Sequence, residues 1–211
     1  PRIDYEHNKI EPKNKNTKLF SIGYAPTWDK GLSLEIAGLD IIKRLLTIKN
    51  SFSHIRLHPC SRTIKTKNGQ LPNGENWLEK IENIGSKNLE FSHNISTIEY
   101  LSKLDLLITD VSSISFEAFL LDIPVIFFHT NEFWDNYRKS IYKNFLLRDK
   151  SNNFEKNEYV NGGRSAGTVV YNIDELLDSI KTIKGNVDIK KSKRREFSDN
   201  LLYNKGKSSK V

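Results

Sequence analysis

One stretch of the chain, residues 106–128, runs through a strand, a turn, a helix and a second strand: LLITDVSSISFEAFLLDIPVIFF. Its first and last segments are almost continuous apolar runs, which is typical of strands buried on both faces of a sheet. A helical pattern lies between them, after Asp110 and two serines. A strand–helix–strand order predicts that the two strands pair in parallel. This stretch therefore limits the chain to an α/β fold.

The same alternation extends along most of the sequence. Strands are expected at residues 19–26, 53–59, 88–93, 105–111, 124–129 and 168–172. Helices are expected at residues 32–49, 74–84, 96–104, 113–122 and 133–144. The helical period is clearest in residues 32–49, where Ile36, Leu39, Ile42 and Leu45 recur on one face. The pattern predicts a doubly wound, mostly parallel, Rossmann-like sheet covered by helices on both faces.

The domain organisation follows from composition. Residues 1–18 are polar and predict a segment or linker outside the fold, and residues 19–211 predict one domain. Helices at 172–183 and 188–203, within 172–205, are expected to close it. The polar, glycine-bearing stretch 148–167 is predicted to be a long loop. The chain begins at Pro1 and contains no methionine, which indicates a piece excised from a longer protein.

Charge and cysteine content narrow the partners and the compartment. The net charge of +7 favours polyanionic partners, although abundant lysine on an ordinary surface is an equal explanation. The basic run KKSKRRE, residues 190–196, is either a solvated helix face or a contact for phosphate or lipid headgroups. A single cysteine, Cys60, and the lack of a signal peptide or an apolar span predict the cytoplasm, with peripheral contact at the inner membrane face as an option.

Polar residues follow four of the expected strands, and in an open parallel sheet ligands bind beyond the carboxyl ends of the strands. The residues at these strand ends are Tyr24, Pro26 and Thr27, then His58, then Asp110, Ser112 and Ser113, and finally His129. We therefore expect one binding site at this edge, in which Thr27, Asp110, Ser112 and Ser113 contact nucleotide or phosphate. Tyr24, Pro26 and His129 are additional candidates.

Two readings are open for the serines and for Glu117. Ser112 and Ser113 stand where a strand turns into a helix, so they either cap the helix or bind a phosphate at its amino end. Glu117 lies one helical turn beyond Ser113 between Phe116 and Phe119, so it either accepts hydrogen bonds from a ribose diol or is a surface glutamate. His58, just before Pro59, is either a core imidazole or a group that donates to a phosphate oxygen.

Several other chemistries lack their sequence patterns. The chain has no G-x-G-x-x-G or G-x-x-x-x-G-K-[ST] fingerprint, no cysteine and histidine pairs at zinc spacing and no G-x-S-x-G elbow. No acidic pair suggests a bound metal, so neither a metal nor a cofactor is expected. The sequence contains no nucleic-acid-binding motif, so binding to nucleic acid is not expected. A non-catalytic basic module that binds nucleic acid is kept as a third hypothesis because of the positive charge.

Four motifs in order resemble a known family: YAPTW at 24–28, RLHP at 56–59, LITDVSSISFE at 107–117 and GKSS at 206–209. Together they resemble the C-terminal half of the CDP-glycerol glycerophosphotransferases, the teichoic-acid and capsule polymerases. The resemblance implies a two-domain GT-B fold in which this half binds the CDP part of the donor. Asp29 and Val111 depart from the family pattern, which often has arginine and tyrosine at these two places.

The resemblance also implies roles for particular residues. His58 corresponds to the histidine that the family needs for activity. Ser112 and Ser113 correspond to its phosphate-binding residues, and Glu117 corresponds to an acidic residue of the family. Lys207 and Ser208 of the GKSS motif are further candidates. The implied partners are CDP-glycerol or another cytidine nucleotide conjugate, an anionic polymer or lipid-linked acceptor, and an N-terminal acceptor domain outside these residues. The HP and SS pair also resembles sialyltransferases and Kdo transferases, which use CMP-sugars.

Overall fold

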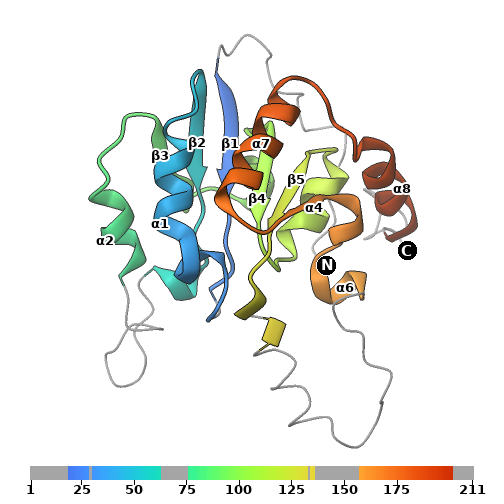
Figure 1. Ribbon diagram of the computed structural model, residues 1–211, viewed down its shortest axis with the longest axis horizontal. Helices are drawn as coiled ribbons and strands as arrows, with labels where there is room; N and C mark the ends of the chain where they lie inside the picture. Colours follow the sequence, from blue (N-terminus) through green and yellow to red (C-terminus); the bar gives the residue numbers. More distant parts are fainter. Residues whose placement is uncertain (1–18, 29, 63–75, 133, 136–156, 202–211) are drawn as a thin grey trace, which may run out of the picture.

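A parallel sheet of six strands forms the centre of the molecule, which is described here by a computed structural model for residues 19–28, 30–62, 76–132, 134–135 and 157–201 (Figure 1). The strand order is β3-β2-β1-β4-β5-β6, and every neighbouring pair is parallel. The strands are β1 Phe20–Tyr24, β2 Ser51–Ile55, β3 Leu89–Phe91, β4 Leu106–Thr109, β5 Val125–Phe128 and β6 Thr168–Val170. The order reverses between β1 and β4, which is where an open sheet of this type forms a crevice for ligands.

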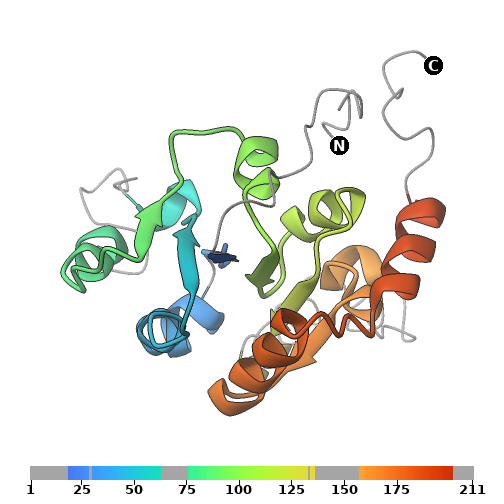
Figure 2. The same cartoon turned by 90° about the horizontal axis from the view of Figure 1, so that it is seen from above.

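Helices cover both faces of this sheet, as Figure 2 shows: α1 and α7 lie on one side, and α3 and α4 lie on the other. The α-helices are α1 Ser33–Leu45, α2 Trp77–Glu82, α3 Thr97–Ser102, α4 Ile114–Leu120, α6 Glu158–Asn161, α7 Ile173–Lys184 and α8 Lys191–Leu201. Short 3₁₀ helices occupy η2 Pro59–Ser61 and η5 Arg164–Ala166. The arrangement confirms the predicted doubly wound α/β class.

The apolar runs of the sequence are explained by burial on both faces. In β4, Leu106 and Ile108 belong to the core under α1 and α7, while Leu107 belongs to the core under α3 and α4. All three side chains are fully buried. A strand with only one covered face would alternate apolar and polar residues, so the continuous run LLI reports two covered faces.

Gly23 in β1 allows α3 and its flanking turn to lie close against the sheet. A Cβ atom at this position would stand 2.3 Å from a methyl carbon of Leu104 and 2.6 Å from the hydroxyl of Tyr100. Tyr100 is fully buried, and its hydroxyl donates a hydrogen bond to the backbone carbonyl of His54 at 3.2 Å. The absence of a side chain at residue 23 is therefore a packing requirement.

Helix α8 is fixed against the turn after α4 by ion pairs. The guanidinium of Arg194 is only 1% exposed and lies 2.7 Å from a carboxylate oxygen of Asp122 and 2.7 Å from one of Asp188. Next to it, Phe197 stacks on Phe116 with the ring centroids 6.1 Å apart. Because Phe116 is part of α4, this packing supports the helix that follows the two serines.

Some sequence predictions need correction. The stretch 148–167 is not a loop throughout, because its described part contains α6 and η5. Short helices of this kind have too few residues to show a period. The helix expected at 133–144 falls almost wholly outside the described residues, as do the segment 1–18 and the candidates Lys207 and Ser208.

Candidate functional site

A pocket of about 230 Å³ lies at the carboxyl ends of β1, β2 and β4. Its lining includes five of the residues predicted from the sequence, which are Pro26, His58, Ser112, Ser113 and Glu117. It also includes residues that the sequence reading missed, among them Arg56, Arg62, His93 and Thr97. The pocket therefore lies where it was predicted, at the carboxyl ends of the strands. Its lining also contains two arginines that were not among the predicted site residues.

The backbone around His58 fixes which nitrogen of its ring carries the proton. The Nδ1 atom accepts a hydrogen bond from the Cys60 backbone N–H at 3.2 Å, at the start of η2. Burial and then the charge of Arg62 lower the pKa of His58 below its usual value. A neutral imidazole that accepts at Nδ1 keeps its proton at Nε2. His58 is therefore set up as a neutral hydrogen-bond donor, and Trp28 stacks beside it with the ring centroids 6.0 Å apart.

The positive charge of the pocket comes from two arginines. Arg56 is committed to the backbone: its Nη1 donates to the carbonyls of Ser92 at 2.6 Å and Ile95 at 3.0 Å. Arg62 makes no ion pair with a carboxylate among the described residues, and its Nε is buried without a hydrogen-bond partner there. A guanidinium that pairs with no carboxylate in the described segments, in a pocket with serine hydroxyls, favours an anionic ligand.

The two serines are placed differently from a simple capping arrangement. Ser113 precedes α4, but its side chain makes no capping hydrogen bond and the residue is exposed. The Ser112 hydroxyl accepts from the Ile114 N–H only at 3.5 Å. Both hydroxyls are thus available to a ligand, and Glu117 lies one turn further along α4. A helix end carries roughly half a unit charge and each guanidinium a full one, so the arginines contribute more positive charge to the pocket than the amino end of α4 does.

Asp110 has a structural role, which corrects the expectation that it contacts phosphate. Its side chain is fully buried, and its Oδ1 accepts from the backbone N–H of Thr27 at 2.9 Å. Its Oδ2 accepts from the Ser33 hydroxyl at 2.7 Å. Thr27 and Tyr24, which were also expected to contact the ligand, make internal contacts instead. The Thr27 hydroxyl donates to the Val111 carbonyl at 3.0 Å. Tyr24 is fully buried, and its hydroxyl is hydrogen-bonded to that of Ser33 at 2.9 Å. These residues shape the loops that form the pocket and do not line it.

His129 lies outside the pocket, in a separate polar cluster after β5. Its Nδ1 is 2.7 Å from Nη1 of Arg164, and its Nε2 is 3.0 Å from Oδ1 of Asn131. Arg164 also donates to the Asp110 carbonyl at 3.4 Å, which connects this cluster to the end of β4. The candidate His129 therefore belongs to a cluster that contacts the backbone of residue 110 and does not line the pocket.

No group of three or more His, Cys, Asp or Glu side chains in the described segments is arranged to hold a metal ion. None of the helices in the same segments combines the length and apolar character that crossing a membrane requires.

The fold and the pocket define a class: this is an α/β domain of the kind that forms one half of a GT-B transferase. The chain belongs to the CDP-Glycerol:Poly(glycerophosphate) glycerophosphotransferase family, whose model matches residues 10–211. This confirms the resemblance drawn from the four sequence motifs. No curated protein matches the chain.

Solved structures agree with this fold. The structure of the wall teichoic acid polymerase TagF matches with a TM-score of 0.58 at 21% identity, covering 100% of this chain and 48% of TagF. The spinosyn rhamnosyltransferase SpnG, complexed with spinosyn aglycone, matches with a TM-score of 0.52 at 12% identity, covering 92% of this chain and 45% of SpnG. The chain thus spans about half the length of these proteins.

Proposed function

We propose that this chain is the donor-binding part of a glycerophosphotransferase that uses CDP-glycerol or a related CDP-alditol and builds a teichoic-acid-like or capsular polymer. The observation that carries the proposal is the pocket in which Arg62, without a carboxylate partner in the described residues, lies with His58, Ser112 and Ser113. Family membership supports it, as does the structure of a TagF variant soaked with CDPG, which matches 92% of this chain at 22% identity with a TM-score of 0.54.

The proposed reaction is a phosphoryl transfer. A hydroxyl of the growing polymer attacks the phosphorus that bears the glycerol, a new P–O bond forms, and the bridging P–O bond to CMP breaks. CMP leaves with the bonding electrons, while the hydroxyl proton passes to a base in the remainder of the protein. Arg62 and the serine hydroxyls hold the diphosphate, and His58 donates from Nε2 to the leaving phosphate. Glu117 accepts from the ribose diol.

The alternatives make different demands on the ligand. A GT-B half that uses a CMP-sugar would keep the cytidine preference but direct the attack to a sugar carbon, and product analysis with CDP-glycerol and CMP-sugars separates the two. A nucleic-acid-binding module would bind DNA or RNA independently of free nucleotide and with a steep dependence on salt.

Calorimetry of the chain with CMP, CDP, UDP and GDP tests the proposal. We expect cytidine nucleotides to bind most tightly, and His58→Ala and Ser113→Ala each to lower the affinity about tenfold, which is the effect of losing one hydrogen bond to a charged group. Preference for UDP or GDP, or unchanged affinity in both variants, contradicts the proposal.

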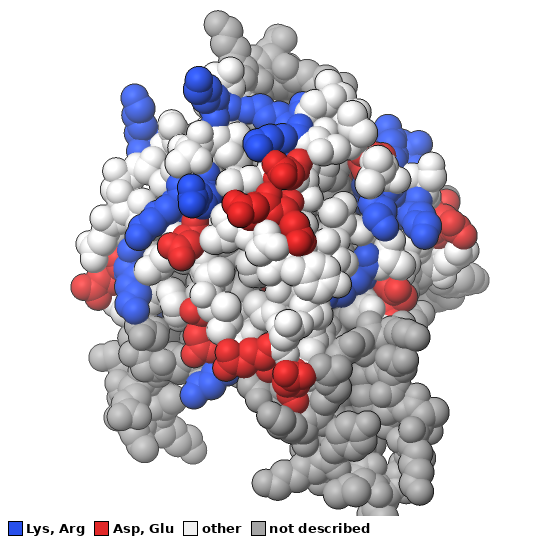
Figure 3. Space-filling model, viewed as in Figure 1, with Lys and Arg blue, Asp and Glu red and all other residues white. Residues whose placement is uncertain are grey.

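A surface far from the pocket supports a second proposed property, contact with an anionic membrane. The turn between α7 and α8, residues 185–190, exposes Val187 by 52% and Ile189 by 74%. Basic side chains lie at the top and right of the face in Figure 3, near the amino edge of the sheet and α8, and also along its left side. Exposed apolar side chains flanked by lysines are typical of surfaces that lie in a lipid interface.

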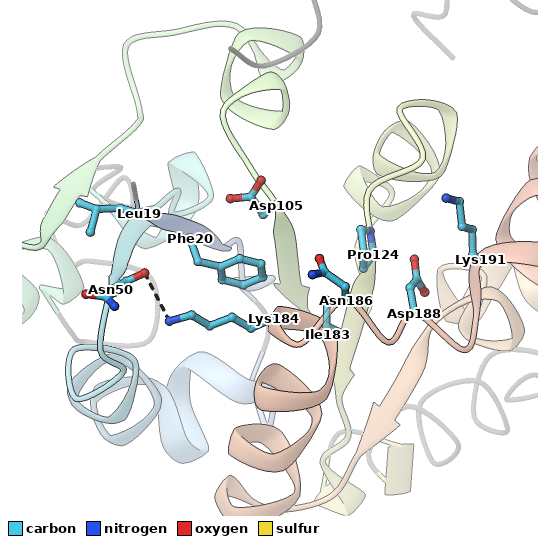
Figure 4. Close-up of a pocket in the computed structure, with 10 residues that line it drawn as sticks. All are labelled: Leu19, Phe20, Asn50, Asp105, Pro124, Ile183, Lys184, Asn186, Asp188 and Lys191. Atoms are coloured by element: carbon cyan, nitrogen blue, oxygen red, sulfur yellow. Dashed lines mark hydrogen bonds between the residues drawn. The ribbon is translucent and has the colours of Figure 1, made fainter. Parts of the chain in front are cut away.

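The same turn borders a hollow at the amino edge of the sheet, of about 770 Å³ (Figure 4). Lys191 lines this hollow with Leu19, which is 41% exposed. Lys184 is turned inward, where its Nζ donates to the Asn50 carbonyl at 3.3 Å and also to the Lys49 carbonyl. Asp188 is paired with Arg194, so its charge is balanced within the protein. The remaining charges of this turn and of the first residue of α8 are therefore those of Lys190 and Lys191.

Sedimentation with lipid vesicles tests the membrane contact. We expect the chain to bind vesicles of phosphatidylcholine with phosphatidylglycerol and not vesicles of phosphatidylcholine alone. Ile189→Ser and Lys191→Gln should each weaken binding about fivefold, since one basic or apolar contact at the interface is worth about 1 kcal/mol. Ile36→Ser, which alters a side chain on α1 that is 49% exposed, is the matched control and should have no effect. Equal losses in the control and the test variants contradict the proposal.

A further inference from the structure

His93 is a polar side chain of the pocket whose hydrogen bonds the fold leaves unmade. It follows β3, lines the pocket, and packs on Phe91 with the ring centroids 5.1 Å apart. Both ring nitrogens are buried and have no hydrogen-bond partner within the described part of the chain. A buried polar atom without a partner destabilises the fold, so such a residue in a pocket wall indicates a ligand that completes its hydrogen bonds.

The surroundings keep this imidazole uncharged. Burial, then the charges of Arg62 and Arg56, lower the pKa of His93 to about 4. The other charged or titratable side chains in the pocket lining are His58 and Glu117. At neutral pH the ring of His93 therefore offers one N–H donor and one acceptor nitrogen.

Because the His93 ring has one donor and one acceptor, it can form complementary hydrogen bonds with only some groups of a nucleotide. A phosphate group offers only acceptors, and Arg62, His58 and the serines already supply donors for it. The edge of a pyrimidine base offers donors and acceptors side by side. Thr97, at the start of α3, lines the pocket next to the loop that holds His93, and α3 packs against α4, which bears Glu117. Glu117 and His93 therefore line one pocket, so a ligand whose ribose contacts Glu117 can place its base at this loop.

Resting on the function proposed above, we infer that His93 is the residue that reads the nucleobase of the donor. Both nitrogens lie below the pocket surface, so recognition requires the ring to rotate toward the ligand. No hydrogen bond from the described residues holds the ring in its present orientation, so rotation about χ1 or χ2 breaks none of them. The loop backbone itself stays fixed, because Arg56 donates to the carbonyls of Ser92 and Ile95 on either side of His93.

Calorimetry with three probes tests this role: CMP, ribose 5-phosphate, which lacks the base, and pyrophosphate. We expect His93→Leu to weaken CMP binding about tenfold and to leave ribose 5-phosphate and pyrophosphate unchanged. His93→Gln, which restores a donor and an acceptor, should recover part of the CMP affinity. The leucine variant should also melt at a temperature roughly 2–4 °C higher, because it removes two unsatisfied nitrogens from a partly apolar site.

The outcomes separate this inference from the proposed function. If the unaltered chain binds CMP no better than ribose 5-phosphate, the proposed cytidine site is itself wrong. The assignment of His93 to the base is wrong if the unaltered chain prefers CMP to ribose 5-phosphate and the His93→Leu variant shows the same preference. It is also wrong if His93→Leu weakens the binding of CMP and of ribose 5-phosphate equally. A lower melting temperature in His93→Leu would mean that the residue serves the fold, and this also overturns the inference.

Discussion

Asp110→Ala is expected to lower the free energy of unfolding by about 3–5 kcal/mol, because several buried donors lose their acceptor at about 1–3 kcal/mol each. The carboxylate is fully buried and accepts hydrogen bonds from Thr27, Val111 and Ser33. Ser33 is the first residue of α1, and its N–H donates to Asp110 at 3.3 Å, while the N-cap residue Leu32 makes no side-chain capping bond. Alanine therefore leaves several buried donors unsatisfied and uncaps α1.

Urea unfolding followed by circular dichroism measures this loss. With a denaturant slope of about 1–3 kcal/mol per molar, the midpoint should fall by about 1–5 M. Asp110→Asn keeps one oxygen acceptor but turns an amide group toward the other donors, so we expect an intermediate loss. Asp40→Ala, at an exposed position of α1, is the control and should change stability by less than about 0.5 kcal/mol. A loss in Asp110→Ala no larger than that of Asp40→Ala contradicts the network.

The fold was predictable because its signals are strong where burial is complete. The runs in β4 and β5 are apolar on both faces, and these strands lie where the sequence predicted them. Boundaries were less accurate: the helix expected at 32–49 ends at Leu45, since Asn50, with φ of 54°, belongs to the turn into β2. The helices in 157–167 were missed because four or three residues cannot display a helical period.

The candidate site was predictable in its place and only partly in its members. His58, Ser112 and Ser113 could be predicted as site residues because each follows a strand, and the parallel topology brings the carboxyl ends of these strands to one edge of the sheet. The sequence could not show that Asp110 turns inward, since that depends on donors from residues 27 and 33. Arg62 was missed, although an arginine four residues after His58, in the turn that follows its strand, is a usable signal of an anion site.

Arg62→Ala is expected to lower the affinity for CDP about 30- to 100-fold, because a charge-assisted contact to a diphosphate in a partly buried site is worth about 2–3 kcal/mol. The side chain lines the pocket and has no carboxylate partner among the residues described, so its charge is not used within the fold. CMP has one phosphate fewer and should lose less, and cytidine, which has none, should lose nothing. Arg62→Lys keeps the charge without the planar fork and should fall between.

Salt dependence gives this prediction a second readout. The affinity of the unaltered chain for CDP should decrease with rising salt, and Arg62→Ala should flatten that dependence, since one fewer charged contact is screened. Lys43→Ala, which removes one charge from the exposed last turn of α1, matches the change in net charge and should leave both the affinity and its salt dependence as they were. If Lys43→Ala weakens CDP as much as Arg62→Ala does, the effect is one of overall charge. If cytidine binding falls along with CDP, Arg62 supports the shape of the pocket instead of contacting the diphosphate, and the phosphate end of the site must be placed elsewhere.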